Sequence, residues 1–344
     1  MKYTHGGDTR SYFERYGKMP LDFSSNINPY PVPDSIAAAA VAAIGDLAAY
    51  PDPYCRELRA ALAKTWTLPA DWFWCGNGAA DVIFRVVSAV KPRRALVTAP
   101  TFSEYEAALA ANGCDVRRYA LRESEDFAIT DGILSAADGA DMVFICNPNN
   151  PTGKLAPSGL LLDLARTGIM LVIDECFLDF TEETSFARHL ADFPNVLILR
   201  SFTKLYAIPA ARLGYCICSD TDLVEKLYIA GPPWNVSAFA QNIGVAALRE
   251  TEFARSSRER IAAERERLTS ELRKLNITVF DGAANYLLIK ARRGLRAELE
   301  TRGILLRSCA DYAGLSDEFY RIAVKNNRDN DALLAALRGI TEVF

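Results

Sequence analysis

Short, continuous apolar runs alternate with amphipathic stretches between residues 45 and 235. Such runs are typical of strands that are buried on both faces, and the stretches between them are long enough for helices. The predicted strands are 95–98, 115–119, 142–146, 170–174, 196–199 and 214–218. This pattern predicts an α/β fold in which a mostly parallel sheet is covered by helices on both faces.

The pattern changes after Pro232 and Pro233. Residues 237–275 predict a long helix whose Arg and Glu residues recur at i, i+4 spacing, which favours a solvated helix face. After it come predicted strands at 278–280, 286–289, 304–306 and 320–324 and a helix at 329–337. We expect a large domain at 45–235 and a small α+β domain made from both chain ends. The small domain takes 236–344 and 1–44, including an alanine-rich helix at 34–44.

Composition narrows the class of protein. The chain has 344 residues, 50% of them hydrophobic, and a formal net charge of −4. Binding to nucleic acid needs clustered excess cation, so no nucleic-acid partner is expected. The N-terminus lacks the apolar core of a signal peptide, and no run approaches the roughly 20 apolar residues of a membrane span. We therefore expect a cytoplasmic protein with no membrane partner.

The cysteines and histidines give no sign of a metal site. Eight cysteines are scattered along the chain, several of them inside apolar runs, and there are only two histidines. Cys216 and Cys218 form one C-x-C pair within an alternating strand pattern, with no second pair. Buried thiols in a reducing compartment are the simplest interpretation, and no metal ligand is predicted.

The segment 201–215 carries the strongest chemical signal. It places Lys204 close behind the hydroxyls of Ser201 and Thr203, with Arg212 eight residues further on. An isolated S-x-T-K sequence is more often a surface loop. A covalently held pyridoxal phosphate, however, needs an amine for its aldehyde and donors with positive charge for its phosphate. Lys204 would supply the amine, and the other three residues would hold the phosphate.

Two polar residues follow predicted strands, where ligands of open α/β sheets bind. Asn150 lies in a turn rich in proline that follows the strand at 142–146, and it would donate to the phenolic oxygen of the cofactor. Asp174 ends the strand at 170–174, and its carboxylate would keep the pyridine nitrogen protonated. Taken alone, the Asn150 segment would be a turn more often than a site, and Asp174 would about equally often be a helix N-cap.

A glycine-rich loop opens the helix predicted at 79–90. Gly78, Ala79 and Ala80 would present backbone amides to a phosphate, because helix N-termini bind anions without side chains. The loop lacks the Gly-Lys-Ser/Thr ending of a nucleotide P-loop. Phe102, in Pro100-Thr-Phe, would stack on the pyridine ring, although an aromatic after a strand is more often core.

Together these segments resemble the fold type I pyridoxal-phosphate superfamily. The matching segments, in chain order, are Tyr50-Pro-Asp-Pro, Gly76-Asn-Gly-Ala-Ala, Pro100-Thr-Phe, Asn149-Asn-Pro-Thr-Gly, Asp174-Glu, Ser201-Phe-Thr-Lys and Arg212-Leu-Gly. The resemblance covers nearly the whole chain. It implies pyridoxal 5'-phosphate as cofactor, a large α/β/α domain with a mostly parallel sheet, and a smaller α+β domain.

Within this superfamily the chain resembles two families, threonine-phosphate decarboxylase of cobalamin biosynthesis and histidinol-phosphate aminotransferase. Three features favour the first family: the opening His5-Gly-Gly-Asp, the segment 203–209 and Phe177. Phe177 stands where aminotransferases usually place a tyrosine that donates to the cofactor. The resemblance implies decarboxylation of L-threonine O-3-phosphate to (R)-1-amino-2-propanol O-2-phosphate, with a histidinol-phosphate or related aminotransferase as the alternative.

The resemblance also implies how the substrate is held. Arg321 matches the arginine that binds the substrate α-carboxylate. Arg307 matches an arginine at the other end of the substrate, where the resemblance implies that it binds the phosphate, with His5, Gly6 and Asn26 beside it. Arginine forks suit both anions.

Two further matches concern assembly and variation within the family. Tyr50 would reach the cofactor phosphate of a neighbouring subunit, which implies a homodimer with shared active sites. Lys325 stands where the family has an arginine, and Ala210-Ala-Arg replaces the usual Gly-Leu-Arg.

Overall fold

A computed structural model describes residues 5–340. Its strands are β1 (Leu21–Asp22), β2 (Phe73–Gly76), β3 (Arg94–Ala99), β4 (Asp115–Ala120), β5 (Met142–Cys146), β6 (Met170–Asp174), β7 (Val196–Ser201), β8 (Gly214–Cys218), β9 (Thr278–Phe280), β10 (Tyr286–Lys290), β11 (Ile304–Leu305), β12 (Arg307–Ser308) and β13 (Phe319–Ala323). Its helices are α1 (Thr9–Tyr16), α2 (Asp34–Ala42), α3 (Arg56–Trp66), α4 (Ala79–Val90), α5 (Glu104–Ala111), α6 (Gly132–Ala136), α7 (Ser158–Arg166), α8 (Thr221–Ile229), α9 (Ala238–Ala247), α10 (Thr251–Lys274), α11 (Leu295–Thr301) and α12 (Asn327–Arg338).

The larger sheet has seven strands in the order β2-β8-β7-β6-β5-β3-β4. β8 runs antiparallel to both of its neighbours, and the remaining neighbours pair in parallel. The prediction of a mostly parallel sheet is therefore confirmed. The ends of β6 and β7 carry Asp174 and Ser201 to the same edge, because adjacent parallel strands end side by side.

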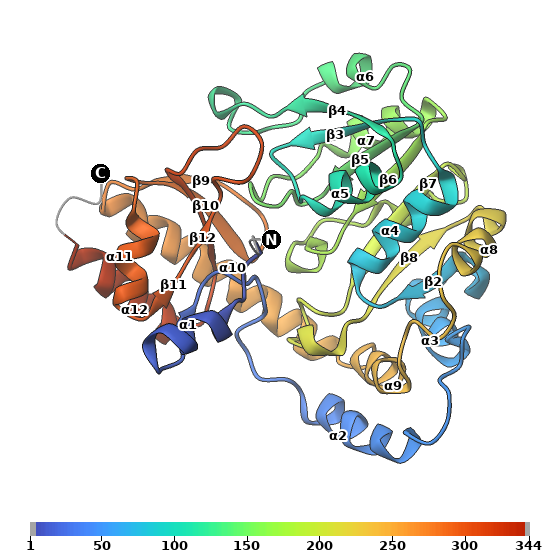
Figure 1. The fold of residues 1–344 in the computed structure, drawn as a ribbon, viewed down its shortest axis with the longest axis horizontal. Coiled ribbons are helices and arrows are strands. Elements are labelled where there is room, and N and C mark those ends of the chain that lie inside the picture. The colour runs from blue at the N-terminus through green and yellow to red at the C-terminus, as the bar shows by residue number, and fades with distance from the viewer. Residues whose placement is uncertain (1–4, 341–344) are drawn as a thin grey trace.

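Helices cover both faces of this sheet (Figure 1). Alternate residues of each strand enter two separate apolar clusters, as the period of a strand requires. Phe144 packs on the face that is covered by α4, α5 and α8, whereas Val143 and Ile145 pack on the face that is covered by α3, α6, α7 and α9. This burial on both faces explains why the strands read as continuous apolar runs.

A second sheet has the order β12-β13-β10-β9 with antiparallel neighbours. Tyr320 and Ile322 join the apolar cluster formed with α10, α11 and α12, while Phe319 joins the cluster on the other side. Arg321 alternates with the first two, so its side chain lies on the face away from these helices. β1 pairs in parallel with β11 and thereby ties the start of the chain to its last third.

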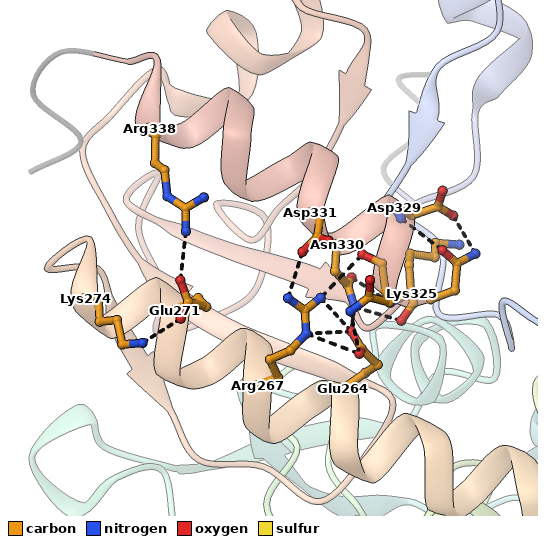
Figure 2. Close-up of polar contacts among 11 residues, drawn as sticks. Glu264, Arg267, Glu271, Lys274, Lys325, Asp329, Asn330, Asp331 and Arg338 are labelled. Carbon is orange, nitrogen blue, oxygen red and sulfur yellow. Dashed lines mark hydrogen bonds and ion pairs between the residues drawn. The ribbon is translucent and has the colours of Figure 1, made fainter.

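The predicted helix at 237–275 is two helices in the structure, because the chain turns between α9 and α10. The charged face of α10 is also not simply solvated. Arg267 pairs with Glu264 on its own helix at 2.9 Å and with Asp331 of α12 at 2.7 Å, and Glu271 accepts from Arg338 of α12 at 2.8 Å (Figure 2). These ion pairs join α10 to α12 at the back of the second sheet.

The helix predicted at 34–44 packs on α9, which also contacts α3 (Figure 1). Its last turn tightens into a short 3₁₀ segment at Ala43–Asp46. The division of the chain at residues 45 and 235 stays a prediction. Among residues 5–340, no helix is long and apolar enough to cross a membrane.

Candidate active site

Lys204 lies in the turn that follows β7, at the edge where the strands of the large sheet end. Its carbonyl accepts a hydrogen bond from the Asn28 amide at 3.0 Å, and its Nζ lies 5.9 Å from the centroid of the Phe177 ring. Burial and the positive charges of Arg321 and Arg212 lower the pKa of Lys204 to about 8. The amine is thus much closer to neutrality at physiological pH than an ordinary lysine.

Asp174 is buried at the end of β6 and does not begin a helix. Its Oδ2 accepts a hydrogen bond from the Tyr105 hydroxyl at 2.5 Å, and its Oδ1 accepts from the Cys176 amide at 2.9 Å. Burial raises the pKa of Asp174, while these donors and the charge of Lys204 oppose the rise. Burial also raises the pKa of Tyr105, so its hydroxyl keeps the proton that it donates.

The start of α4 forms a cradle with Arg212. Gly78 is the N-cap residue of α4, has φ 83° and ψ 165°, and as glycine offers no side chain to cap the first amides of the helix. A Cβ at this position would lie 2.5 Å from Nη2 of Arg212, so the guanidinium stands directly against the loop. Arg212 itself has φ 52°, and its Nη1 donates to the Pro209 carbonyl at 2.9 Å.

The hydroxyls that flank Lys204 lie near the loop at the start of α4. Ser201 Oγ and Thr203 Oγ1 are 2.8 Å apart, and both side chains are buried. A Cβ at Gly214, which pairs with Ser201, would lie 2.6 Å from the amide of Ala79. The two hydroxyls, the start of α4 at Ala79 and Ala80, and the Arg212 guanidinium therefore lie close together. Hydroxyls, helix N-terminal amides and a guanidinium are the donor set that a phosphate requires.

Asn150 connects this region to the second sheet. Its Oδ1 accepts from Arg321 Nη1 at 2.6 Å and lies 3.5 Å from the Tyr312 hydroxyl. The oxygen of the amide is thus turned towards the arginine, and no hydrogen bond among the described residues uses its Nδ2. Arg321 also donates from Nη2 to the Ser24 carbonyl at 2.6 Å.

Arg307 and Arg321 are direct partners in the register of β12 and β13, so their side chains leave the same face of the sheet. They are only 8% and 6% exposed, respectively. Nη2 of Arg307 donates to Asp311 Oδ2 at 2.7 Å, and Nε of Arg321 is buried with no hydrogen-bond partner in the described part of the chain.

The N-terminal segment closes over the same place. Gly6 fits only as glycine, because a Cβ there would lie 2.0 Å from the Ser24 carbonyl oxygen. Nε2 of His5 lies 2.9 Å from Glu104 Oε1, so His5 is held in place and is not at a frayed end. Asn26 is 3% exposed, and both polar atoms of its amide are buried without a partner among residues 5–340. An amide in that state is suited to a ligand.

Aromatic side chains line the site. Phe102 lies 6.0 Å from the His5 ring and packs edge-on against Tyr105 at 5.7 Å. Phe177 packs edge-on against Tyr286 at 5.0 Å and carries no hydroxyl for a cofactor oxygen. Tyr50 is 82% exposed and stacks on Trp234 at 4.9 Å, away from the residues above.

Lys325 lies two residues beyond β13. Burial lowers the pKa of Lys325, and the charges of Asp22 and Asp329 oppose this shift. Its backbone amide donates to Asn330 Oδ1 at 3.1 Å, next to the ion pairs between α10 and α12 (Figure 2). The backbone of Lys325 is thus tied to the first turns of α12.

Sequence reasoning missed three polar partners in this region. Tyr105 holds Asp174, Glu104 pairs with His5, and Asp311 pairs with Arg307. Glu104 and Tyr105 begin α5, two and three residues after Phe102. This closeness in sequence to a predicted cofactor residue was the one signal that could have pointed to them. Within the described residues, no group of three His, Cys, Asp or Glu side chains could hold a metal ion, and all eight cysteines are buried and free.

The residues fit pyridoxal 5'-phosphate. Three features lie around one edge of the sheet: the amine of Lys204 with its lowered pKa, the buried carboxylate of Asp174, and the loop at Gly78, where Arg212 leaves no room for a Cβ. In this arrangement Lys204 would hold the cofactor aldehyde, Asp174 its pyridine nitrogen, and Gly78 with Arg212 its phosphate.

Comparison with known proteins agrees with this chemistry. Residues 18–337 match the model of the family "Aminotransferase class I and II". The chain is 41% identical to threonine-phosphate decarboxylase of Salmonella typhimurium, covering 98% of this chain and 96% of the relative. It is 35% identical to a protein of Caldanaerobacter subterraneus named as a putative threonine-phosphate decarboxylase, covering 99% and 94% of the two chains.

The fold matches that of solved enzymes. Histidinol-phosphate aminotransferase from Clostridium acetobutylicum superimposes with a TM-score of 0.87 at 31% identity, over 92% of this chain and 98% of the other. On the family match and on these relatives, the chain belongs to the class I and II aminotransferase family, with its fold type I α/β architecture.

Proposed function

We propose that this protein uses pyridoxal 5'-phosphate to decarboxylate L-threonine O-3-phosphate to (R)-1-amino-2-propanol O-2-phosphate in cobalamin biosynthesis. The observation that carries the proposal is the buried pair of Arg307 and Arg321, which face the same side of the second sheet in direct register. Like charges placed opposite each other destabilise a sheet unless anions compensate them. A substrate with a carboxylate and a phosphate supplies two such anions, and the 41% identical relative is named for such a substrate.

Each arginine has its own anion in this proposal. Arg321 binds the α-carboxylate, since it contacts Asn150 next to the cofactor residues. Arg307 binds the phosphate, and Asn26, His5 and Gly6 supply further polar atoms at that end of the site. Fixing both ends of the substrate sets which bond at the α-carbon is oriented for cleavage.

The bound cofactor supplies an electron sink for the bond that breaks at the α-carbon. Asp174 keeps the ring nitrogen protonated, with Tyr105 and the Cys176 amide fixing its carboxylate. Lys204, whose pKa is lowered to about 8, delivers a proton to the α-carbon after carbon dioxide has left. Phe177 contributes an apolar face near this amine and no competing donor.

A homodimer with shared active sites completes the proposal. Several large apolar side chains are exposed in the segment before Tyr50 and at and after the end of α8, and a second copy would cover them: Val41, Ile44, Leu47, Ile229 and Trp234, the last of which stacks on Tyr50. Tyr50 would then reach the cofactor phosphate of the neighbouring subunit. Sedimentation equilibrium of the purified protein tests this, and a monomer at micromolar concentration would contradict it.

The alternative function is a histidinol-phosphate aminotransferase, which the likeness to the Clostridium acetobutylicum enzyme favours. The two functions are separated by supplying the protein with L-threonine O-3-phosphate, and then with histidinol phosphate and 2-oxoglutarate. Carbon dioxide release in the first reaction supports the decarboxylase, whereas glutamate formation without carbon dioxide would overturn it. O-phosphoserine is included as a substrate, because one methyl group changes binding by only about 1–3 kcal/mol.

A further inference from the structure

The side chain of Arg307 is bound by residues of the turn that follows it. Its Nη2 donates to Asp311 Oδ2 at 2.7 Å, and its Nη1 donates to the carbonyl of Ser308. The guanidinium lies 5.1 Å from the centroid of the Tyr312 ring. Both terminal nitrogens of the arginine proposed to bind phosphate are therefore engaged by residues that lie one to four positions further along the chain.

A substrate phosphate must compete with Asp311 for this guanidinium. Arg307 is 8% exposed, and removing the anionic partner of a buried cation is costly, so a phosphate that displaces Asp311 must take its place on the guanidinium. Only molecules in which Asp311 has released Arg307 bind the phosphate well. The apparent Kd for the substrate then equals the intrinsic Kd divided by the fraction of such molecules.

The released carboxylate of Asp311 has a place to go. Asp311 lines a cavity of about 80 Å³ together with Thr98, Phe102, Arg118 and Tyr312. Thr98 is 1% exposed, and its hydroxyl is buried with no hydrogen-bond partner among residues 5–340. Arg118 and Glu106 also line this cavity and form an ion pair at 2.6 Å, so Arg118 offers its remaining guanidinium donors while the pair as a whole is neutral. A hydroxyl donor and a guanidinium are the partners that a displaced carboxylate needs.

We propose that Asp311 is a latch on Arg307, a positioning residue that holds the guanidinium when no phosphate is bound and yields it when a phosphate-bearing substrate enters. The latch rests on the proposed function in assigning Arg307 to phosphate. It also acts in release, because the decarboxylated product has lost its hold on Arg321 and is retained mainly through its phosphate. Return of Asp311 to Arg307 then assists the departure of the product.

The test measures ligand binding to the holoenzyme by calorimetry, with no turnover. The probe is 3-phosphonopropionate, which carries a carboxylate and a phosphonate but no amine, and the control ligand is propionate, which lacks the group for Arg307. Asp311→Asn keeps the shape of the side chain and removes its charge. The matched control variant is Asp317→Asn, since Asp317 pairs with Arg293 at 3.1 Å on the surface nearby.

Asp311→Asn is expected to tighten binding of 3-phosphonopropionate about tenfold, the effect of weakening one hydrogen bond to a charged group. Propionate binding should stay unchanged, and Asp317→Asn should match the wild type with both ligands. In an Arg307→Gln background, Asp311→Asn should have no further effect on the phosphonate. Steady-state kinetics should show a lower KM for L-threonine O-3-phosphate and stronger product inhibition.

Unchanged or weaker phosphonate binding in Asp311→Asn would overturn the latch alone, because Asp311 would then merely hold Arg307 in its binding position. Equal tightening of propionate would also overturn it, since the effect would not be local to Arg307. Failure of the wild type to bind 3-phosphonopropionate more tightly than propionate would overturn both the latch and the assignment of Arg307. Absence of carbon dioxide release, with the binding results as expected, would contradict only the proposed reaction.

Discussion

Replacing Gly78 by alanine tests the phosphate cradle at its tightest point. The backbone at φ 83° and ψ 165° lies in a region that is almost restricted to glycine, so alanine there costs about 1–3 kcal/mol. The new Cβ would also lie 2.5 Å from Nη2 of Arg212. Because non-bonded heavy atoms in contact lie roughly 3.5 Å apart, the guanidinium must move by about 1 Å.

This movement should weaken cofactor binding. Nη1 of Arg212 donates to the Pro209 carbonyl at 2.9 Å. A shift of the guanidinium therefore breaks that hydrogen bond or turns the side chain away from the position proposed for the phosphate. A hydrogen bond to a charged group contributes about 1.5–3 kcal/mol. We therefore expect the Kd of Gly78→Ala for pyridoxal 5'-phosphate to rise about tenfold to hundredfold.

The assay titrates apoprotein with cofactor in phosphate-free buffer and follows visible absorbance, while thermal unfolding of the apoprotein reports backbone strain. Gly17→Ala is the matched control, since Gly17 has φ 68° and no atom of another residue would lie within 4 Å of a Cβ added there. The control should lose stability but keep its cofactor affinity. Wild-type affinity in Gly78→Ala would refute the cradle.

Four further outcomes are expected. Lys204→Ala should lose the visible absorbance of bound cofactor, and an unchanged spectrum would contradict the role of this lysine. Covalent capture of cofactor by wild-type apoprotein should accelerate as the pH rises to about 8 and then level off in stopped-flow absorbance, because the amine of Lys204 is mostly neutral above its lowered pKa. Tyr105→Phe removes the donor to Asp174 and should lower kcat about tenfold with KM unchanged in steady-state kinetics. Arg200→Met leaves Glu175 buried without its cation, 3.1 Å away in the wild type, and should lower the free energy of unfolding in urea by about 3–5 kcal/mol.

The sequence predicts some elements with their observed bounds and misses others for physical reasons. β5, β6 and β8 agree residue for residue, because strands buried on both faces are apolar throughout. β1 has two residues, and it is a strand only because Leu21 and Asp22 pair with Ile304 and Leu305, so no local pattern marks it. The turn between α9 and α10 falls on Leu-Arg-Glu, which carries no proline or glycine to announce it.

The candidate site likewise contains residues that the sequence predicts and residues that it does not. Residues that follow strand ends or open a helix, such as Asp174, Lys204 and Gly78, occupy positions that the fold class defines in advance. The residues that bind to site residues do not occupy such positions. Tyr105 and Asp311 are ordinary helix and loop residues, and only the packing of the sheet against the chain ends brings them to Asp174 and Arg307.

The short parallel pairing of β1 with β11 has a consequence for how the site is completed. The residues proposed for the cofactor within one chain lie between 78 and 212, whereas those proposed for the substrate carboxylate and phosphate come from residues 5–26 and 307–321. Arg321 donates directly to the carbonyl of Ser24, just beyond β1. Within one chain, the cofactor residues are therefore brought together by the large sheet, whereas the substrate residues come from both chain ends, which the two-residue pairing of β1 with β11 joins.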